Sequence, residues 1–120
     1  MKAHPRGAAW EALAERFLSS RGLRVLERNF HCRLGEIDLV MRDGATVVFV
    51  EVRYRGSAVY GSAAETVGAR KRLRIQRAAG IYIGRRPALT EQPCRFDVVG
   101  ISGTHERPRI DWRRAAFDAW

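Results

Sequence analysis

In the middle of the chain, a segment of alternating apolar and polar residues is followed by a run of apolar residues, which is typical of a β-hairpin. In residues 35–41 apolar and polar side chains alternate, which is the period of a half-buried strand. Residues 47–50 are all apolar, as expected of a central strand that is covered on both faces. Asp43 and Gly44 lie between the two segments and predict a tight two-residue turn.

This turn also predicts which charged side chains meet. With Asp43 and Gly44 as the loop, Asp38 becomes the diagonal neighbour of Glu51 on one face of the hairpin. A loop that is wider by two residues would set the two acids directly opposite each other, whereas a one-residue slip would put them on opposite faces. Arg53 shares the face of Glu51. Two carboxylates on one face repel each other, and a divalent cation is the simplest relief.

Two further segments repeat apolar residues with helical spacing. Residues 8–20 predict a first helix, and Glu11 lies on the shoulder of its stripe, either leaning toward a sheet or solvated. Residues 63–83 predict a second helix with Lys71 inside its apolar face, where a lysine either snorkels outward or points at an anion or carboxylate. The two stripes comprise Trp10, Leu13, Ala14, Phe17 and Leu18, and then Ala64, Val67, Ile75, Ala78, Ala79 and Tyr82.

Three shorter segments complete the predicted order of elements. Residues 23–30 form a strand with charged flanks, typical of a sheet edge, and residues 95–101 and 110–112 form two later strands. The order of helix, three strands, helix and two strands predicts one α/β domain with a mixed sheet of about five strands flanked by helices.

The remaining segments carry smaller expectations. The loop of residues 56–62 bears Tyr60 and either contacts a substrate or acts as a linker. Arg95 and Asp97 share one face of their strand and are expected to form a structural pair, and the tail of residues 115–120 is expected to dock on the core.

The composition of the chain indicates which class of binding partner to expect. The chain has 120 residues, of which 46% are hydrophobic, and its 22 basic against 13 acidic residues give a formal charge of +9. This imbalance favours a polyanion such as nucleic acid over an ordinary solvated basic surface. On the second helix, Arg70, Arg74 and Arg77 lie on the side away from Lys71 and form a basic ridge suited to phosphates, and the five basic residues of positions 70–77 also include Arg72. No apolar run approaches the roughly 20 residues that span a membrane.

The number of cysteines indicates which cellular compartment to expect. The only cysteines are Cys32 and Cys94, and no apolar leader precedes the first helix, so a reduced cytoplasmic setting is expected. The pair His31-Cys32 invites a zinc site, but the chain lacks the Cys-x-x-Cys spacing of such sites, and packed thiols are favoured.

The acidic residues also carry a family resemblance. Glu11, Asp38 within Gly-Glu-Ile-Asp-Leu-Val, and Glu51-Val52-Arg53 resemble the YraN-like family, which is similar to archaeal Holliday-junction resolvases of the PD-(D/E)xK nuclease fold. The further matches are Arg28, Asn29, Gly61, Lys71, residues 95–99, Ala116 and Phe117.

The resemblance implies a restriction-endonuclease-like three-layer fold over residues 1–120. It implies that Asp38 and Glu51 bind Mg²⁺ or Mn²⁺, joined by the carbonyl of Val52, while Glu11 approaches directly or through water. Arg53 stands where nucleases of this fold carry lysine, and arginine stays protonated, so it can stabilise a phosphate but cannot act as a base. Lys71 is hypothesised to take the place of that lysine. The expected catalytic residues are Glu11, Asp38, Glu51, Arg53 and Lys71.

Three functions compete. The first is a metal-dependent, structure-selective endonuclease that acts, as a homodimer, on branched or repair-intermediate DNA rather than RNA. The second is a nucleic-acid-binding module that keeps the fold without the chemistry, and the third, which the charge least favours, is a structural partner-binding domain. In the first two cases the expected nucleic-acid contacts are Arg55, Arg70, Lys71, Arg72, Arg74 and Arg77.

Overall fold

The structure, a computed structural model, describes residues 5–55 and 67–118, in the order helix, three strands, helix, two strands. The elements are α1 (Pro5–Ser20), β1 (Arg24–Cys32), β2 (Gly35–Asp43), β3 (Thr46–Arg55), α2 (Ala69–Gly84), the 3₁₀ helix η2 (Pro87–Leu89), β4 (Cys94–Gly103) and β5 (Pro108–Phe117). The expectations for Tyr60 and its loop, Gly61, residues 63–66 and Trp120 lie outside the described residues.

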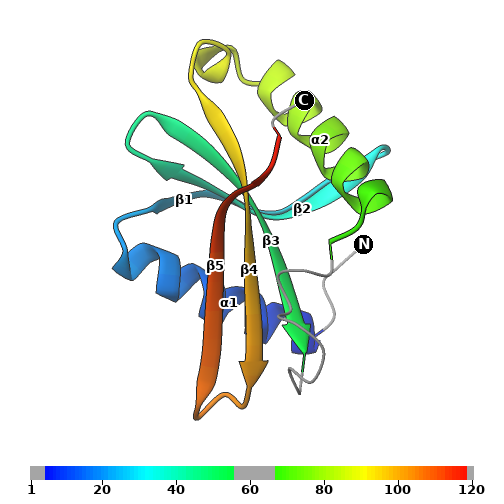
Figure 1. Cartoon of the computed structure of the whole chain (residues 1–120). Coiled ribbons are helices and arrows are strands. Elements are labelled where there is room, and N and C mark those ends of the chain that lie inside the picture. Colours follow the sequence, from blue (N-terminus) through cyan, green and yellow to red (C-terminus); the bar gives the residue numbers. More distant parts are fainter. Residues whose placement is uncertain (1–4, 56–66, 119–120) are drawn as a thin grey trace.

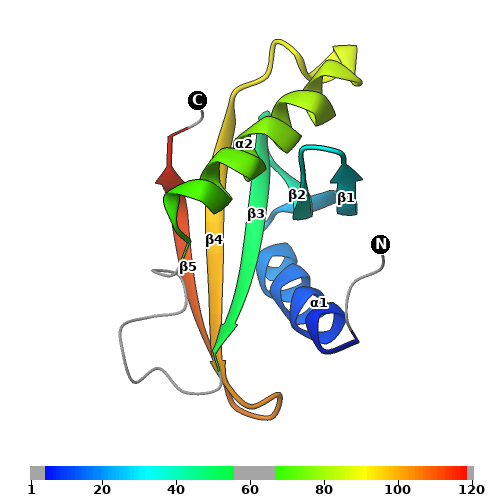
Figure 2. The same ribbon diagram turned by 90° about the vertical axis from the view of Figure 1, so that its right-hand side faces the viewer.

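The five strands form one mixed sheet in the order β1-β2-β3-β4-β5. Only β3 and β4 run parallel, and the other neighbouring pairs are antiparallel. Figures 1 and 2 show α1 on one face of the sheet and α2 on the other, which gives three layers. The predicted α/β class, the mixed five-stranded sheet and the edge position of the first strand are therefore confirmed.

Each face of the sheet buries its own apolar cluster, because each is covered by one helix. The residues 47–50 of β3 are all fully buried, as the predicted central strand requires. The cluster under α1 includes Trp10, Ala14, Leu18, Leu39, Met41, Val48, Val50, Val99 and Ile101. The cluster under α2 includes Phe30, Ile37, Phe49, Ile75, Ala78, Ala79, Tyr82, Phe96 and Val98. None of the helices in the described part of the chain combines the length and the apolar character that crossing a membrane requires.

The hairpin turn differs from the prediction by one position. Asp43 pairs with Thr46, so the loop consists of Gly44 and Ala45 rather than Asp43 and Gly44. Gly44 has a φ of 61°, the left-handed conformation that glycine adopts without a side-chain clash. The register consequently shifts by two residues, which keeps every side chain on its predicted face.

Two other boundaries were predicted wrongly. α2 begins at Ala69, after an extended Gly68, although helical periodicity predicted a start near residue 63. The last strand has ten residues instead of three, because β5 continues past a left-handed Ala115. Tertiary contacts hold this extension in place: Phe117 stacks on Phe96 with 5.0 Å between ring centroids, which confirms that the tail docks on the core.

Asp97 explains how the extension is anchored. This fully buried carboxylate accepts hydrogen bonds from the Nε of Arg95 at 3.0 Å, from the Nε1 of Trp112 at 2.9 Å and from the backbone N–H of Ala115 at 3.0 Å. Arg95 also reaches Asp43 at 3.0 Å. The predicted structural pair of Arg95 and Asp97 is thus confirmed, and it links β4 to the β2–β3 turn and to β5.

Candidate active site

The site begins where the regular pairing of β2 and β3 ends. The last paired residues are Leu39 and Val50, and continuing that register places Asp38 opposite Glu51. Beyond this point the N–H of Val52 donates to the Oδ2 of Asp38 at 2.8 Å, so a side chain replaces the usual backbone acceptor. The two acids therefore share a face, as predicted, but as direct rather than diagonal neighbours.

Glu51 is buried among charges of both signs. Only 4% of it is exposed, and its Oε2 lies 3.5 Å from the Nζ of Lys71 and 3.8 Å from the Nη1 of Arg53. Its other oxygen, Oε1, is buried and has no hydrogen-bond partner. An unsatisfied buried acceptor costs about 1–3 kcal/mol, so this oxygen is poised to bind a donor or a cation. Burial and the neighbouring Asp38 raise the pKa of Glu51 to about 8.

Glu11 approaches Asp38 from α1. Burial, together with the charge of Asp38, raises the pKa of Glu11 to about 7, against a hydrogen bond from the side chain of Asn29 that lowers it. Burial also raises the pKa of Asp38, which interacts with both glutamates. Of the two alternatives that the sequence left open for Glu11, the structure has the one in which it leans toward the sheet. Asp38 is thus the carboxyl group that both glutamates interact with.

Asn29 is the residue of this site whose role the sequence did not reveal. It has a φ of 53°, a left-handed conformation that asparagine adopts more readily than most residues, and its side chain holds Glu11. The preceding Arg28 grips Glu15 of α1 through two hydrogen bonds, of 2.6 and 2.8 Å. Together the two residues tie α1 to β1 beside the carboxyl groups. The only sequence signal was their place in the family pattern.

Asp38 and Glu51 are the candidate ligands for a divalent ion. Within residues 5–55 and 67–118 no three His, Cys, Asp or Glu side chains are gathered closely enough to hold a metal ion. Two of the predicted ligands, Asp38 and Glu51, nevertheless lie side by side, and the orphaned Oε1 of Glu51 is the oxygen acceptor that a hard cation prefers. The pair fits Mg²⁺, which keeps several waters and needs few protein ligands.

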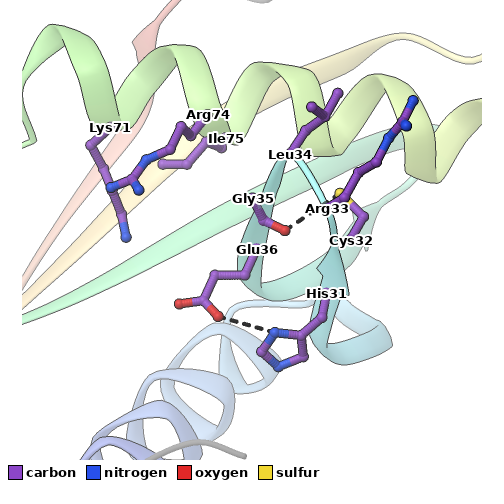
Figure 3. Close-up of a pocket in the computed structure, with 9 residues that line it drawn as sticks. All are labelled: His31, Cys32, Arg33, Leu34, Gly35, Glu36, Lys71, Arg74 and Ile75. Carbon is purple, nitrogen blue, oxygen red and sulfur yellow. Dashed lines mark hydrogen bonds and ion pairs between the residues drawn. The ribbon is translucent and has the colours of Figure 1, made fainter. Parts of the chain in front are cut away.

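A basic cavity of about 280 Å³ lies between the β1–β2 turn and the first half of α2, and Lys71, which contacts Glu51, lines it. Figure 3 shows the side chain of Lys71 descending from α2 and that of Arg74 lying toward Lys71, while Glu36 and His31 of the neighbouring hairpin pair at 3.0 Å. Arg33 lines the same cavity from the turn. The sequence placed Arg74 on the far side of α2 from Lys71. The structure corrects this, because residues three positions apart on a helix are neighbours.

The other predicted nucleic-acid contacts are spread over the same face of the sheet. Arg70 and Arg77 are exposed on α2, and Arg55 lies at the end of β3. Arg72 instead turns toward β5, where its guanidinium lies 5.5 Å from the ring centre of Phe117. There it lines a second cavity, of about 290 Å³, together with Arg113, Arg114, Val67, Val98, Ala116 and Phe117. Basic cavities thus flank α2 on both sides of Lys71.

Sequence comparison adds the family. Residues 10–101 match the model of the uncharacterised protein family UPF0102, which is more than half of the chain. The chain belongs to UPF0102. A UPF0102 protein of Stutzerimonas stutzeri strain A1501 is 48% identical over 113 residues, covering 94% of each chain. A member from Xanthomonas oryzae pv. oryzae strain PXO99A is 50% identical over 114 residues, covering 95% of this chain and 92% of its own. The predicted family is thereby confirmed for this UPF0102 chain, while the similarity to archaeal resolvases stays a prediction.

The raised pKa values predict how the stability of this UPF0102 chain depends on pH in the absence of divalent ions. A carboxyl group whose folded pKa lies above its ordinary value of 4.5 stabilises the fold when protonated, and this contribution is lost as pH rises toward 8. We expect Glu51→Gln to remove that loss. Urea unfolding in EDTA from pH 5 to pH 9 should then show the wild type falling relative to the variant by roughly 2–4 kcal/mol. Parallel curves for the two proteins would contradict the assignment.

Proposed function

We propose that this protein is a Mg²⁺- or Mn²⁺-dependent, structure-selective endonuclease that hydrolyses phosphodiester bonds in branched or repair-intermediate DNA. The observation that carries the proposal is the buried, unpaired Oε1 of Glu51 beside Asp38, under a helix rich in basic residues. Two adjacent buried acids are costly without a cation, and such cost is typically retained where it serves chemistry. Basic cavities on both sides of Lys71 support a polyanionic substrate.

The residues divide the work by their chemistry. Asp38 and Glu51 would hold the ion, with Glu11 reaching it through water, in keeping with the interaction of Glu11 with Asp38 and not with Glu51. Bound there, the ion would lower the pKa of a water molecule and offset charge on the phosphate. Lys71 and Arg53 place two cations within 4 Å of Glu51, where they would stabilise the negative charge that develops on the phosphate oxygens.

A second function is supported by one specific observation. Lys71 and Arg53 already lie within 4 Å of Glu51, where an ion would also have to sit, and the described residues bring no three metal-binding side chains together. A nucleic-acid-binding module that has kept the fold without hydrolysis would look the same. Both functions use the basic face, so binding alone does not separate them.

The test is cleavage by the whole protein, with Mg²⁺ and Mn²⁺ titrated separately against a four-way junction, a flap and a plain duplex, and with an RNA duplex as comparison. The endonuclease proposal expects metal-dependent cleavage of the branched DNA substrates above the duplex. Binding that is insensitive to metal and never followed by cleavage would support the second function. Binding should weaken steeply with salt in either case, because phosphate contacts release counterions. Sedimentation at assay concentrations tests the expected homodimer.

A further inference from the structure

Three aromatic rings stack at the end of β3, on the face of the sheet that α1 covers. The ring of Trp10 lies between those of Tyr54 and His105, with centroid distances of 4.0 and 3.9 Å and interplanar angles of 12° and 10°. Trp10 is 8% exposed, whereas Tyr54 is 41% exposed and His105 is also on the surface. The stack is therefore covered at its centre and open at its ends.

The surrounding turn is built to hold the stack in place. The Tyr54 hydroxyl donates to the carbonyl of Gly103 at 3.0 Å, and the N–H of Arg107 donates to the Oγ1 of Thr104 at 3.1 Å. Gly103 has a φ of 85°, and a Cβ there would meet the carbonyl oxygen of Arg107 at 2.5 Å. The β4–β5 turn consequently has little freedom to collapse onto the rings.

A cavity of about 430 Å³ opens at this stack. Its lining consists of Trp10, Tyr54, Gly103, Thr104, His105 and Glu106. It combines aromatic faces with a hydroxyl and a carboxylate, which can accept hydrogen bonds from the amino groups of bases. Aromatic rings next to hydrogen-bonding groups are the usual equipment for holding unpaired bases.

The location of the stack favours a nucleic-acid occupant. Trp10 directly precedes Glu11, and Tyr54 lies three positions beyond Glu51 on β3, a distance of roughly 10 Å along a strand. Figure 1 shows the start of α1 beside the arrowhead of β3, at the end of the sheet that also carries the β4–β5 turn. Arg55 and Arg109 both pair with Ser102 at this end of the sheet, where they add positive charge on the face opposite the stack.

We propose that the cavity binds an unpaired nucleobase, which continues the stack of Tyr54, Trp10 and His105 and positions the strand next to Glu11, on the α1 side of the carboxyl groups. This inference rests on the proposed function and deepens it: the substrate carries unpaired nucleotides next to the bond that is attacked. Branch points and flaps provide such bases, and an intact duplex does not.

The test measures binding by the whole protein in EDTA, so that no cleavage intervenes, using fluorescence anisotropy with a single-stranded oligonucleotide, a flap and a blunt duplex. Tyr54→Leu removes the ring and should weaken binding of the single strand and the flap by about tenfold while leaving duplex binding within twofold. Tyr54→Phe keeps the ring and loses only the hydroxyl, so it should bind like the wild type. His105→Leu gives an independent variant in an exposed turn and should also weaken binding of unpaired strands.

A second readout uses the unmodified protein. 2-Aminopurine placed at the branch of the flap should lose fluorescence on binding, because stacking quenches it, and the same probe within a duplex should not. Equal losses for all three DNA forms in both leucine variants, unchanged binding, or unquenched probe would overturn the inference. A wild type that binds duplex and flap equally well would overturn it alone, whereas a wild type that binds no nucleic acid would overturn the proposed function too.

Discussion

Replacing Asp38 with asparagine is expected to reduce metal-dependent cleavage of branched DNA by at least about a thousandfold, and Glu51→Gln should do the same. Both substitutions keep the shape of the side chain and remove the negative charge that an ion requires. Asparagine still offers an oxygen to the N–H of Val52, so the local hydrogen bond is preserved. Initial rates at saturating Mn²⁺, compared with DNA affinity in EDTA, separate lost chemistry from lost binding.

Glu91→Gln provides the matched control, because it removes the same charge from an exposed acid between η2 and β4. It should cleave like the wild type. Both site variants should bind the flap in EDTA at least as tightly as the wild type, since a negative charge near the phosphates has been removed. Cleavage that persists in both variants would show that the activity arises elsewhere or from a contaminant.

The core of this fold was predictable because its apolar periods are unambiguous. The residues 47–50 can satisfy a strand only if both faces are covered, and the two helical stripes supply the two covers. Boundaries were less predictable, because they depend on contacts between distant residues. The length of β5, for example, follows from two hydrogen bonds to Asp97, donated by Trp112 and Ala115, which lie 15 and 18 positions away in the sequence.

The hairpin register shows the limit of turn chemistry. Asp-Gly is a good pair for the loop, yet Arg95 draws Asp43 into the strand by a hydrogen bond of 3.0 Å, and Gly44 then becomes the first loop residue. Arg95 lies more than fifty positions away, so no local pattern reveals its influence. Each side chain lies on its predicted face only because the register shifted by an even number of residues.

The acidic residues of the candidate site were predictable from the sequence, whereas the residues that position them were less so. Alternation placed Asp38 and Glu51 on one face, as observed, whereas helical spacing left Glu11 either leaning toward the sheet or solvated, and the structure has the first. Asn29 is a different case, because its function depends on a left-handed backbone that a sequence does not display. The aromatic stack also escaped prediction, since Trp10, Tyr54 and His105 come from three separate elements.

Lys71→Met is expected to lower cleavage by about a hundredfold or more while changing affinity for the flap by less than about fivefold. Lys71 of α2 lies 3.5 Å from Glu51, and Arg53 of β3 lies 3.8 Å from the same oxygen of Glu51. Losing its ammonium group should therefore remove a cation from the reacting phosphate, whereas losing one of several surface cations weakens binding only modestly.

The variants Lys71→Arg and Arg16→Met complete this experiment. Arg16 is exposed on α1, so its loss removes one positive charge away from the carboxyl groups and should leave cleavage unchanged. Lys71→Arg keeps the charge but cannot act as a base, because a guanidinium stays protonated. Rates close to the wild type in Lys71→Arg would assign Lys71 an electrostatic role, and rates as low as in Lys71→Met would assign it proton transfer or exact placement of its single nitrogen. Undiminished cleavage by Lys71→Met would remove Lys71 from the mechanism and leave Arg53 as the cation that serves the phosphate.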